Sequence, residues 1–180
     1  MRIKIAILLV LIVSVSACSE APGLEGPVTT EAPAPQFQIP GLAELTQTYG
    51  CGYGFWLGNG DQTVALRLEY AVPPDAPPTF IPEGSVTLPD PTWTAQMVFG
   101  TDLYANWCDD VIEDGEPAPV QTTTMPLTAG TITWLEAPAV FDGGRAAIAV
   151  DDLEVTTPEG DTVPLGGGQI TNPDFGFFAG

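Results

Sequence analysis

Carboxylates and cysteines are the side chains of this 180-residue chain that could carry chemistry, because it has 23 Asp and Glu, three Cys and no His. The densest acidic run spans residues 109–116. Its five carboxylates are Asp109, Asp110, Glu113, Asp114 and Glu116. A site with oxygen ligands alone suits Ca²⁺ far better than Zn²⁺ or Cu²⁺.

The spacing of this run does not match the calcium loop of an EF-hand. Aligning Gly115 with the loop glycine places Ile112 where an oxygen ligand belongs. We therefore expect a solvated acidic loop and no bound metal or other cofactor. A weak Ca²⁺ site formed by the five carboxylates is the alternative.

The composition excludes most catalytic designs. Without His there is no Ser-His-Asp triad, no Cys-His pair and no cupredoxin-type copper site. Lys4 is the sole lysine and lies near the N-terminus, which excludes Schiff-base chemistry in the remainder of the chain. Paired carboxylates, as in glycosidases, are the common design that remains. We expect a protein that is not an enzyme, with a carboxylate-dependent hydrolase as an alternative.

The first 18 residues have the features of a secretory signal. Two cations, Arg2 and Lys4, precede an apolar run over residues 5–13, which is shorter than the roughly 20 residues of a membrane-spanning helix. The run ends in Val15-Ser16-Ala17-Cys18, which resembles the lipobox of bacterial lipoproteins. The resemblance implies cleavage before Cys18, a diacylglycerol on its thiol, and an extracytoplasmic protein anchored to the cell membrane or the outer membrane.

Cleavage would leave Cys51 and Cys108 as an even pair in an oxidising compartment. We expect them to form one disulfide. Closing a loop of this length stabilises the fold by about 4 kcal/mol in the entropic account of cross-links.

The charge of the mature chain limits its partners. Two arginines would face 23 carboxylates, a side-chain charge of −21. Such a chain cannot neutralise phosphates, so nucleic acid is excluded as a partner. A saline habitat is one explanation of the acidity, because salt screens the repulsion. Capture of cations or of a basic partner is the other.

Six aromatic residues lie near the two cysteines in the sequence. They are Tyr49, Tyr53, Phe55, Trp56, Tyr104 and Trp107. Aromatic residues at strand spacing usually pack in a core. If they were exposed instead, they could form a platform on which a sugar stacks.

The elements that would position these residues are strands. Residues 63–70 alternate apolar and polar side chains, as do residues 93–99, and both patterns indicate half-buried strands. Gly58-Asn59-Gly60-Asp61 predicts a hairpin before the first of them, because Asn-Gly accepts positive φ. Five prolines between residues 71 and 82 indicate a loop. Further short strands are expected at 85–88, 120–125, 130–135, 145–150, 153–157, 162–165 and 169–171. Gly166–Gly168 is expected to form a turn.

Seven to nine short strands without an amphipathic helix predict an all-β fold, namely a two-sheet antiparallel sandwich of the immunoglobulin-like class. We expect three segments: a signal peptide at 1–17, the lipid-anchor cysteine with a disordered Pro-, Thr- and Glu-rich spacer at 18–47, and the β domain at 48–180. The expected function is a non-catalytic binding or envelope-structural module, tethered to the membrane by its lipid anchor. A carbohydrate-binding module is a further alternative, and the protein or glycan partner is not specified.

Overall fold

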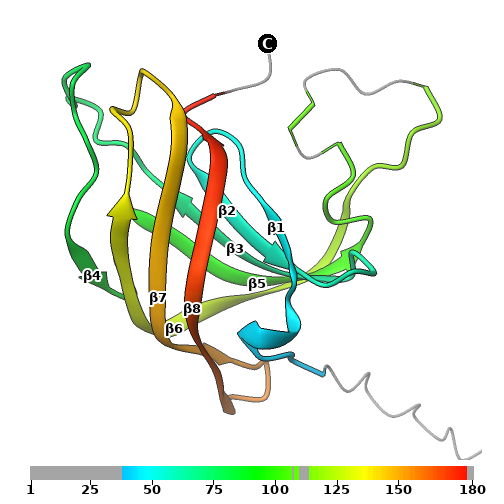
Figure 1. Cartoon of the computed structure of the whole chain (residues 1–180). Helices are drawn as coiled ribbons and strands as arrows, with labels where there is room; N and C mark the ends of the chain where they lie inside the picture. Colours follow the sequence, from blue (N-terminus) through cyan, green and yellow to red (C-terminus); the bar gives the residue numbers. More distant parts are fainter. Residues whose placement is uncertain (1–37, 107, 110–113, 178–180) are drawn as a thin grey trace, which may run out of the picture. The chain divides into compact units, whose positions relative to one another are not determined.

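The structure is a computed structural model that describes residues 38–106, 108–109 and 114–177 (Figure 1). The described chain is all-β apart from one short 3₁₀ turn, η1 (Leu42–Glu44). Its strands are β1 (Gln47–Tyr49), β2 (Gly54–Gly58), β3 (Val64–Tyr70), β4 (Ser85–Thr87), β5 (Trp93–Thr101), β6 (Val120–Glu136), β7 (Gly144–Thr156) and β8 (Thr162–Phe175). The expected all-β class is therefore confirmed.

The strands form one antiparallel sheet in the order β1-β2-β3-β5-β6-β7-β8, and β4 pairs with the second half of β6. Apart from β4, each strand pairs with the next in the chain, as in a meander. The sheet curls until the end of β8 meets the start of β2, where Gly52 and Phe175 form a parallel bridge. The result is a nearly closed barrel, as Figure 1 shows.

The expected two-sheet, immunoglobulin-like sandwich is not confirmed. Pairs of segments that we expected as separate strands are joined into β6, β7 and β8, which have 17, 13 and 14 residues. Bulges bend these long strands between the segments that we expected to be separate, for example beside Gly130, with φ 126°. Gly166–Gly168 lies within β8, opposite Val150 and Leu153, so the prediction of a turn there was wrong. Long bent strands continue from one wall of the barrel to the next, which removes the division into two sheets.

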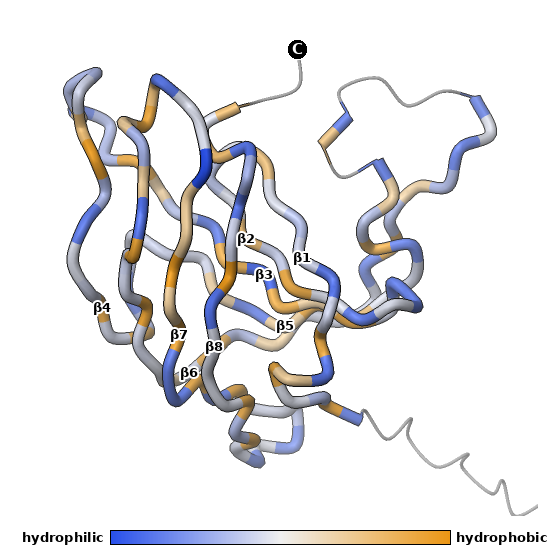
Figure 2. The backbone as a smooth tube through the Cα atoms, viewed as in Figure 1, coloured by the Kyte–Doolittle hydropathy of each residue, from blue (hydrophilic) through white to orange (hydrophobic). Residues whose placement is uncertain are grey.

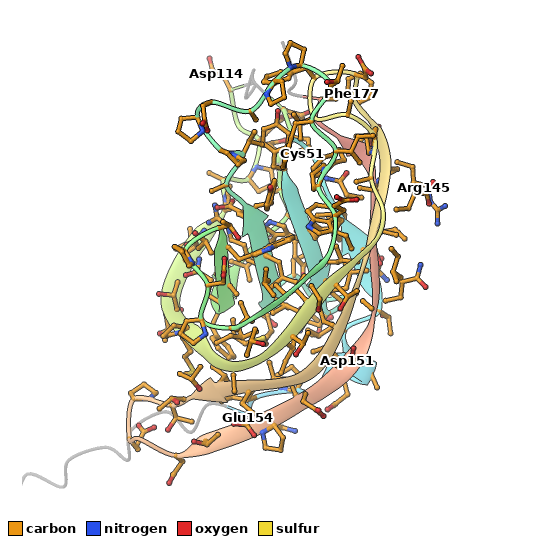
Figure 3. All side chains as sticks on the ribbon, turned by 90° about the vertical axis from the view of Figure 1, so that its left-hand side faces the viewer. Cys51, Asp114, Arg145, Asp151, Glu154 and Phe177 are labelled. Atoms are coloured by element: carbon orange, nitrogen blue, oxygen red, sulfur yellow. A yellow bond between two sulfur atoms is a disulfide. The ribbon has the colours of Figure 1, made fainter. Side chains whose placement is uncertain are left out.

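The interior of the barrel is filled by apolar side chains from alternate strand positions (Figure 3). On β3, Leu66 and Leu68 are fully buried in this core, whereas Arg67 and Glu69, which alternate with them, point outward and pair with each other. The alternation predicted for residues 63–70 and 93–99 is confirmed, with β3 beginning at Val64. Figure 2 shows the same change of hydropathy from one residue to the next along the strands.

The packed part of the chain begins before β1. Leu42 in η1 and Leu45 just after it are 5% and 3% exposed and belong to the main core. Both lie in the segment that the sequence assigns to the spacer. The hydrophobic core thus extends to residues on the N-terminal side of the expected boundary at residues 47 and 48.

A second, smaller core covers the outer face of β2, β3 and β5. Its members are Trp56, Ala65, Val98, Leu103 and Tyr104. The segment after β5 lies over the sheet, and the Tyr104 hydroxyl donates a hydrogen bond to the Val64 carbonyl at 2.7 Å. The predicted disulfide joins Cys51 to Cys108 in the structure, with Cα atoms 5.9 Å apart. It therefore links the segment after β5 to the connection between β1 and β2.

The side chain of Asn172 supports the seam between β8 and β2. It is fully buried, and its amide nitrogen donates to the Gly54 carbonyl at 2.7 Å. Its amide oxygen accepts a hydrogen bond from the Asp174 backbone at 2.9 Å. Nearby, Gly52 and Phe177 pair through a backbone hydrogen bond of 2.7 Å. Side-chain hydrogen bonds thus supplement the few backbone bonds that close the barrel.

Candidate functional site

A pocket of about 530 Å³ lies at the end of the barrel where β3 ends and β5 begins. We call it the aromatic pocket. It is lined by Tyr70, Thr79, Phe80, Ile81, Glu83, Val86, Thr92, Trp93 and Trp134. Its size lies within the usual range for small-molecule sites, and the mouth of a β-barrel is a common place for them.

The proline-rich loop between β3 and β4 forms one wall of the aromatic pocket. Its start is paired with the turn before β5, where the Ala71 amide donates to the Thr92 carbonyl at 2.8 Å. Its middle is held by the Val140 amide, which donates to the Phe80 carbonyl at 3.0 Å. Hydrogen bonds from separate parts of the barrel therefore hold this loop against the pocket.

Three aromatic rings from three different strands meet in the pocket. The ring centres of Tyr70 and Trp93 are 5.3 Å apart, those of Tyr70 and Trp134 are 5.2 Å apart, and those of Trp93 and Trp134 are 5.4 Å apart. The interplanar angles are 53°, 86° and 41°, in the same order. The rings therefore pack against one another at an angle, and they do not form a flat platform.

Buried aromatic residues support these rings from below. Phe55 is fully buried, with its ring centre 6.1 Å from that of Trp93 and 5.7 Å from that of Trp134. Phe175 lies 5.6 Å from Trp134 and 5.8 Å from Phe55. Close packing on fixed neighbours restricts ring movement, so the walls of the pocket are preorganised.

The charges around the aromatic pocket are negative. Glu83 is the ionisable acid of its lining, and no basic side chain of the described residues lines it. Asp90 adjoins it through Thr92, and hydrogen bonds from the Thr92 hydroxyl and backbone amide hold the pKa of Asp90 below its ordinary value. Burial raises the pKa of Tyr70, so its phenol stays neutral and can donate a hydrogen bond.

The two arginines of the described chain lie elsewhere and are engaged. Arg67 forms an ion pair with Glu69 and lies over the Trp56 ring, 5.1 Å from its centre. Arg145 pairs with Glu136 at 2.9 Å, and Figure 3 shows its side chain pointing away from the barrel. Neither is among the residues that line the aromatic pocket.

The aromatic residues near the cysteines do not form an exposed platform. Phe55, Trp56 and Tyr104 are at most 6% exposed and belong to the two cores. Tyr49 is half-buried and stacks on Tyr104 with ring centres 4.5 Å apart. Tyr53 is half-buried and donates its hydroxyl hydrogen to the Val140 carbonyl at 3.1 Å. Trp107 lies outside the described residues.

Only part of the acidic run at residues 109–116 lies within the described residues. Asp109, Asp114 and Glu116 are exposed, whereas Asp110 and Glu113 lie outside the described residues. Within the described ranges, no three His, Cys, Asp or Glu side chains lie close enough together to hold a metal ion. The described part of this run therefore does not form a ligand set.

A second, smaller pocket of about 350 Å³ lies beside the disulfide. Its lining is Thr48, Tyr49, Gly50, Tyr104, Asn106, Cys108, Asp109, Pro173 and Asp174. It contains two carboxylates, Asp109 and Asp174, and both are exposed. A glycosidase needs one carboxyl group in an apolar setting that keeps it protonated, and these exposed positions do not supply that setting.

Sequence reasoning missed the aromatic pocket, although Tyr70 and Trp93 lie in the two segments that were predicted as half-buried strands. The available signal was their position, since they end and begin the two strands on either side of the proline-rich region. Aromatic residues at the ends of neighbouring strands lie at the same end of a barrel. Trp134 and Glu83 come from other parts of the chain, and no pattern connects them to this site.

No protein-family model, curated protein or solved structure matches this chain. The described residues also include no helix whose length and hydropathy would let it span a bilayer.

Proposed function

We propose that this protein is a membrane-tethered, extracytoplasmic binding protein that holds a small ligand in the aromatic pocket. The observation that carries the proposal is the pocket itself, in which Tyr70, Trp93 and Trp134 stand at angles on a buried aromatic base. Such a site offers large apolar contact at little cost in side-chain entropy, because its walls are already fixed.

A binding role fits the chemistry of the lining better than catalysis does. The aromatic pocket contains one carboxylate, Glu83, two threonine hydroxyls and a neutral phenol. Carboxylate hydrolysis requires a pair of acids about 5–10 Å apart. A single exposed carboxylate can orient or attract a ligand, and we assign Glu83 that part.

NMR of the four tryptophan indoles tests the proposed site. In ¹⁵N spectra recorded with a set of neutral and charged small molecules, ligands should shift the indole signals of Trp93 and Trp134. The signal of Trp56 should not move, because that ring is fully buried in the outer core. If no compound shifts the first two signals, or if all four shift together, the aromatic pocket is not a ligand site.

The membrane tether rests on the lipobox-like residues Val15-Ser16-Ala17-Cys18. Acyl chains on Cys18 would hold the protein firmly at a membrane surface, since each buried CH₂ contributes about 0.8 kcal/mol. Expressed with its own leader in a bacterium, the protein should partition into detergent, and Cys18→Ser should remain in the aqueous phase or stay unprocessed. Intact mass spectrometry of a mature chain with an unmodified Cys18 would refute the anchor.

A further inference from the structure

We propose that the ligand of the aromatic pocket is a small organic cation with a quaternary ammonium head group. This inference rests on the proposed function, and it deepens that function by naming the class of ligand. It combines the geometry of three rings with the charges that surround them.

The ring geometry suits a compact, roughly spherical group. No two of the rings Tyr70, Trp93 and Trp134 are parallel, since their planes meet at 41° to 86°. A flat sugar face would therefore stack on one ring at most. A tetrahedral trimethylammonium group can contact several ring faces at once, and tryptophan is the ring that attracts a cation most strongly.

The charges around the pocket favour a ligand of positive charge. Glu83 lies in the lining, and the carboxylate of Asp90, held ionised by Thr92, adjoins it. The chain as a whole carries a formal charge of −19. A negative field of this kind raises the local concentration of cations and repels anions.

A head group without N–H donors also fits the lining. Among its side chains, the pocket offers four acceptor groups, namely the Glu83 carboxylate and the hydroxyls of Thr79, Thr92 and Tyr70. The Thr92 hydroxyl already donates to Asp90. A primary ammonium ion would lose hydration in this lining without gaining three hydrogen bonds, whereas a quaternary ammonium ion has no N–H groups to satisfy.

Choline and its neutral carbon isostere, 3,3-dimethylbutan-1-ol, test the proposal directly. The two molecules share shape and hydroxyl group and differ in charge. Calorimetry and the indole NMR signals should show choline binding at least about fivefold more tightly, as a partly desolvated cation–π contact predicts. Phosphocholine should bind more weakly than choline, because its phosphate would face Glu83 and Asp90.

Two charge-removing variants provide a test at the pocket and its matched control. Glu83→Gln should weaken choline binding about two- to fivefold, as expected for one nearby exposed charge. Glu159→Gln removes the same charge from the exposed turn between β7 and β8, which does not line the pocket, and should leave binding unchanged. Both side chains are exposed, so both variants should keep the fold. Trp134→Leu removes one wall and should abolish the preference for choline over the isostere.

The outcomes separate this inference from the proposed function. Equal binding of choline and its isostere would overturn the proposal that the ligand is a cation, while leaving the aromatic pocket as a site for neutral ligands. Tighter binding of phosphocholine would overturn a ligand of net positive charge. Failure of choline to shift the indole signals of Trp93 and Trp134, while another compound in the NMR set does so, would overturn the inference alone.

Discussion

Asp90 lies in the turn before β5, where Thr92 donates two hydrogen bonds to the same carboxylate oxygen, Oδ1. These bonds favour the ionised carboxylate, which lowers its pKa below the ordinary value of 3.8. The turn leads directly into Trp93, a wall of the aromatic pocket. One carboxylate thus both shapes the entry to β5 and keeps a negative charge beside the site.

The pH dependence of Asp90 follows from the direction of this shift. Because the pKa of Asp90 is lower in the folded than in the unfolded state, ionised Asp90 stabilises the fold at pH values above the unfolded-state pKa. This stabilisation is lost as the pH falls through the folded-state pKa. Thr92→Val removes the hydroxyl and should raise the pKa of Asp90 toward 3.8, while the backbone amide keeps part of the shift. Carbon-detected NMR titration measures this, with Thr94→Val on the exposed face as control. An unchanged Asp90 pKa in Thr92→Val would contradict the role of the hydroxyl.

At the scale of the elements, the hairpin between β2 and β3 shows what local sequence can predict. The hairpin is confirmed, but the positive φ lies at Gln62, at 56°, and not in the Asn-Gly pair. Asn59 acts through its side chain, which accepts hydrogen bonds from the backbone amides of Thr63 and Val64 at 2.9 and 3.1 Å. A local motif identified the turn, whereas its geometry depends on an Asx-type hydrogen-bond pattern that spacing alone does not reveal.

Two glycines of this hairpin should respond differently to alanine. A Cβ atom on Gly58 would overlap the Tyr104 hydroxyl group, so the outer core would have to move. A Cβ on Gly60 would meet no atom within 4 Å. Gly58→Ala should therefore lower the free energy of unfolding by about 1–3 kcal/mol, and Gly60→Ala should change it little. Urea unfolding measures both, and equal stabilities would show that Tyr104 does not pack on β2 in this way.

The seam between β8 and β2 is the weakest-paired part of the barrel, and Asn172 compensates for it. Asn172→Ala would leave the carbonyl of Gly54 and the amide of Asp174 without their buried partner. We expect a loss of about 1–3 kcal/mol in stability and faster amide exchange at Gly52 and Gly176, whose backbone bonds close the seam. Gln169→Ala, at an exposed position of the same strand, is the control and should fall within about 0.5 kcal/mol of the parent.

For the molecule as a whole, the sequence predicts the positions of strand segments well, but it does not predict how the sheet closes into a barrel. Period-2 alternation identified the strands because burial on one face of a strand depends on neighbouring residues. Whether the segments of β6 to β8 form separate short strands or long bent ones depends on bulges near Gly130 and Gly166. In the sequence, glycine is equally typical of a bulge and of a turn. The aromatic pocket was beyond prediction for the same reason, since Trp134 joins Tyr70 and Trp93 only when the sheet curls.

The acidity of the chain is also a property of the whole molecule, and it leads to a prediction about salt. A formal charge of −19 opposes the compact state, and the ion pairs Arg67–Glu69 and Arg145–Glu136 neutralise two of the carboxylates within the described ranges. Screening should therefore stabilise the fold, because it acts on every exposed carboxylate whatever the valence of the added ion.

A bound Ca²⁺ ion would act differently, by mass action on the folded state. Extracellular Ca²⁺ modules typically have Kd values of about 10⁻⁴–10⁻³ M, so about 10 mM Ca²⁺ would add about 1.4–2.7 kcal/mol beyond screening. Because Asp109, Asp114 and Glu116 do not gather into a ligand set, we expect CaCl₂ and NaCl at matched ionic strength to raise Tm equally. A shift specific to Ca²⁺ that disappears in the double variant Asp110→Asn, Asp114→Asn would show that the run at 109–116 binds the ion. The acidity would then be local chemistry as well as a means of solubility.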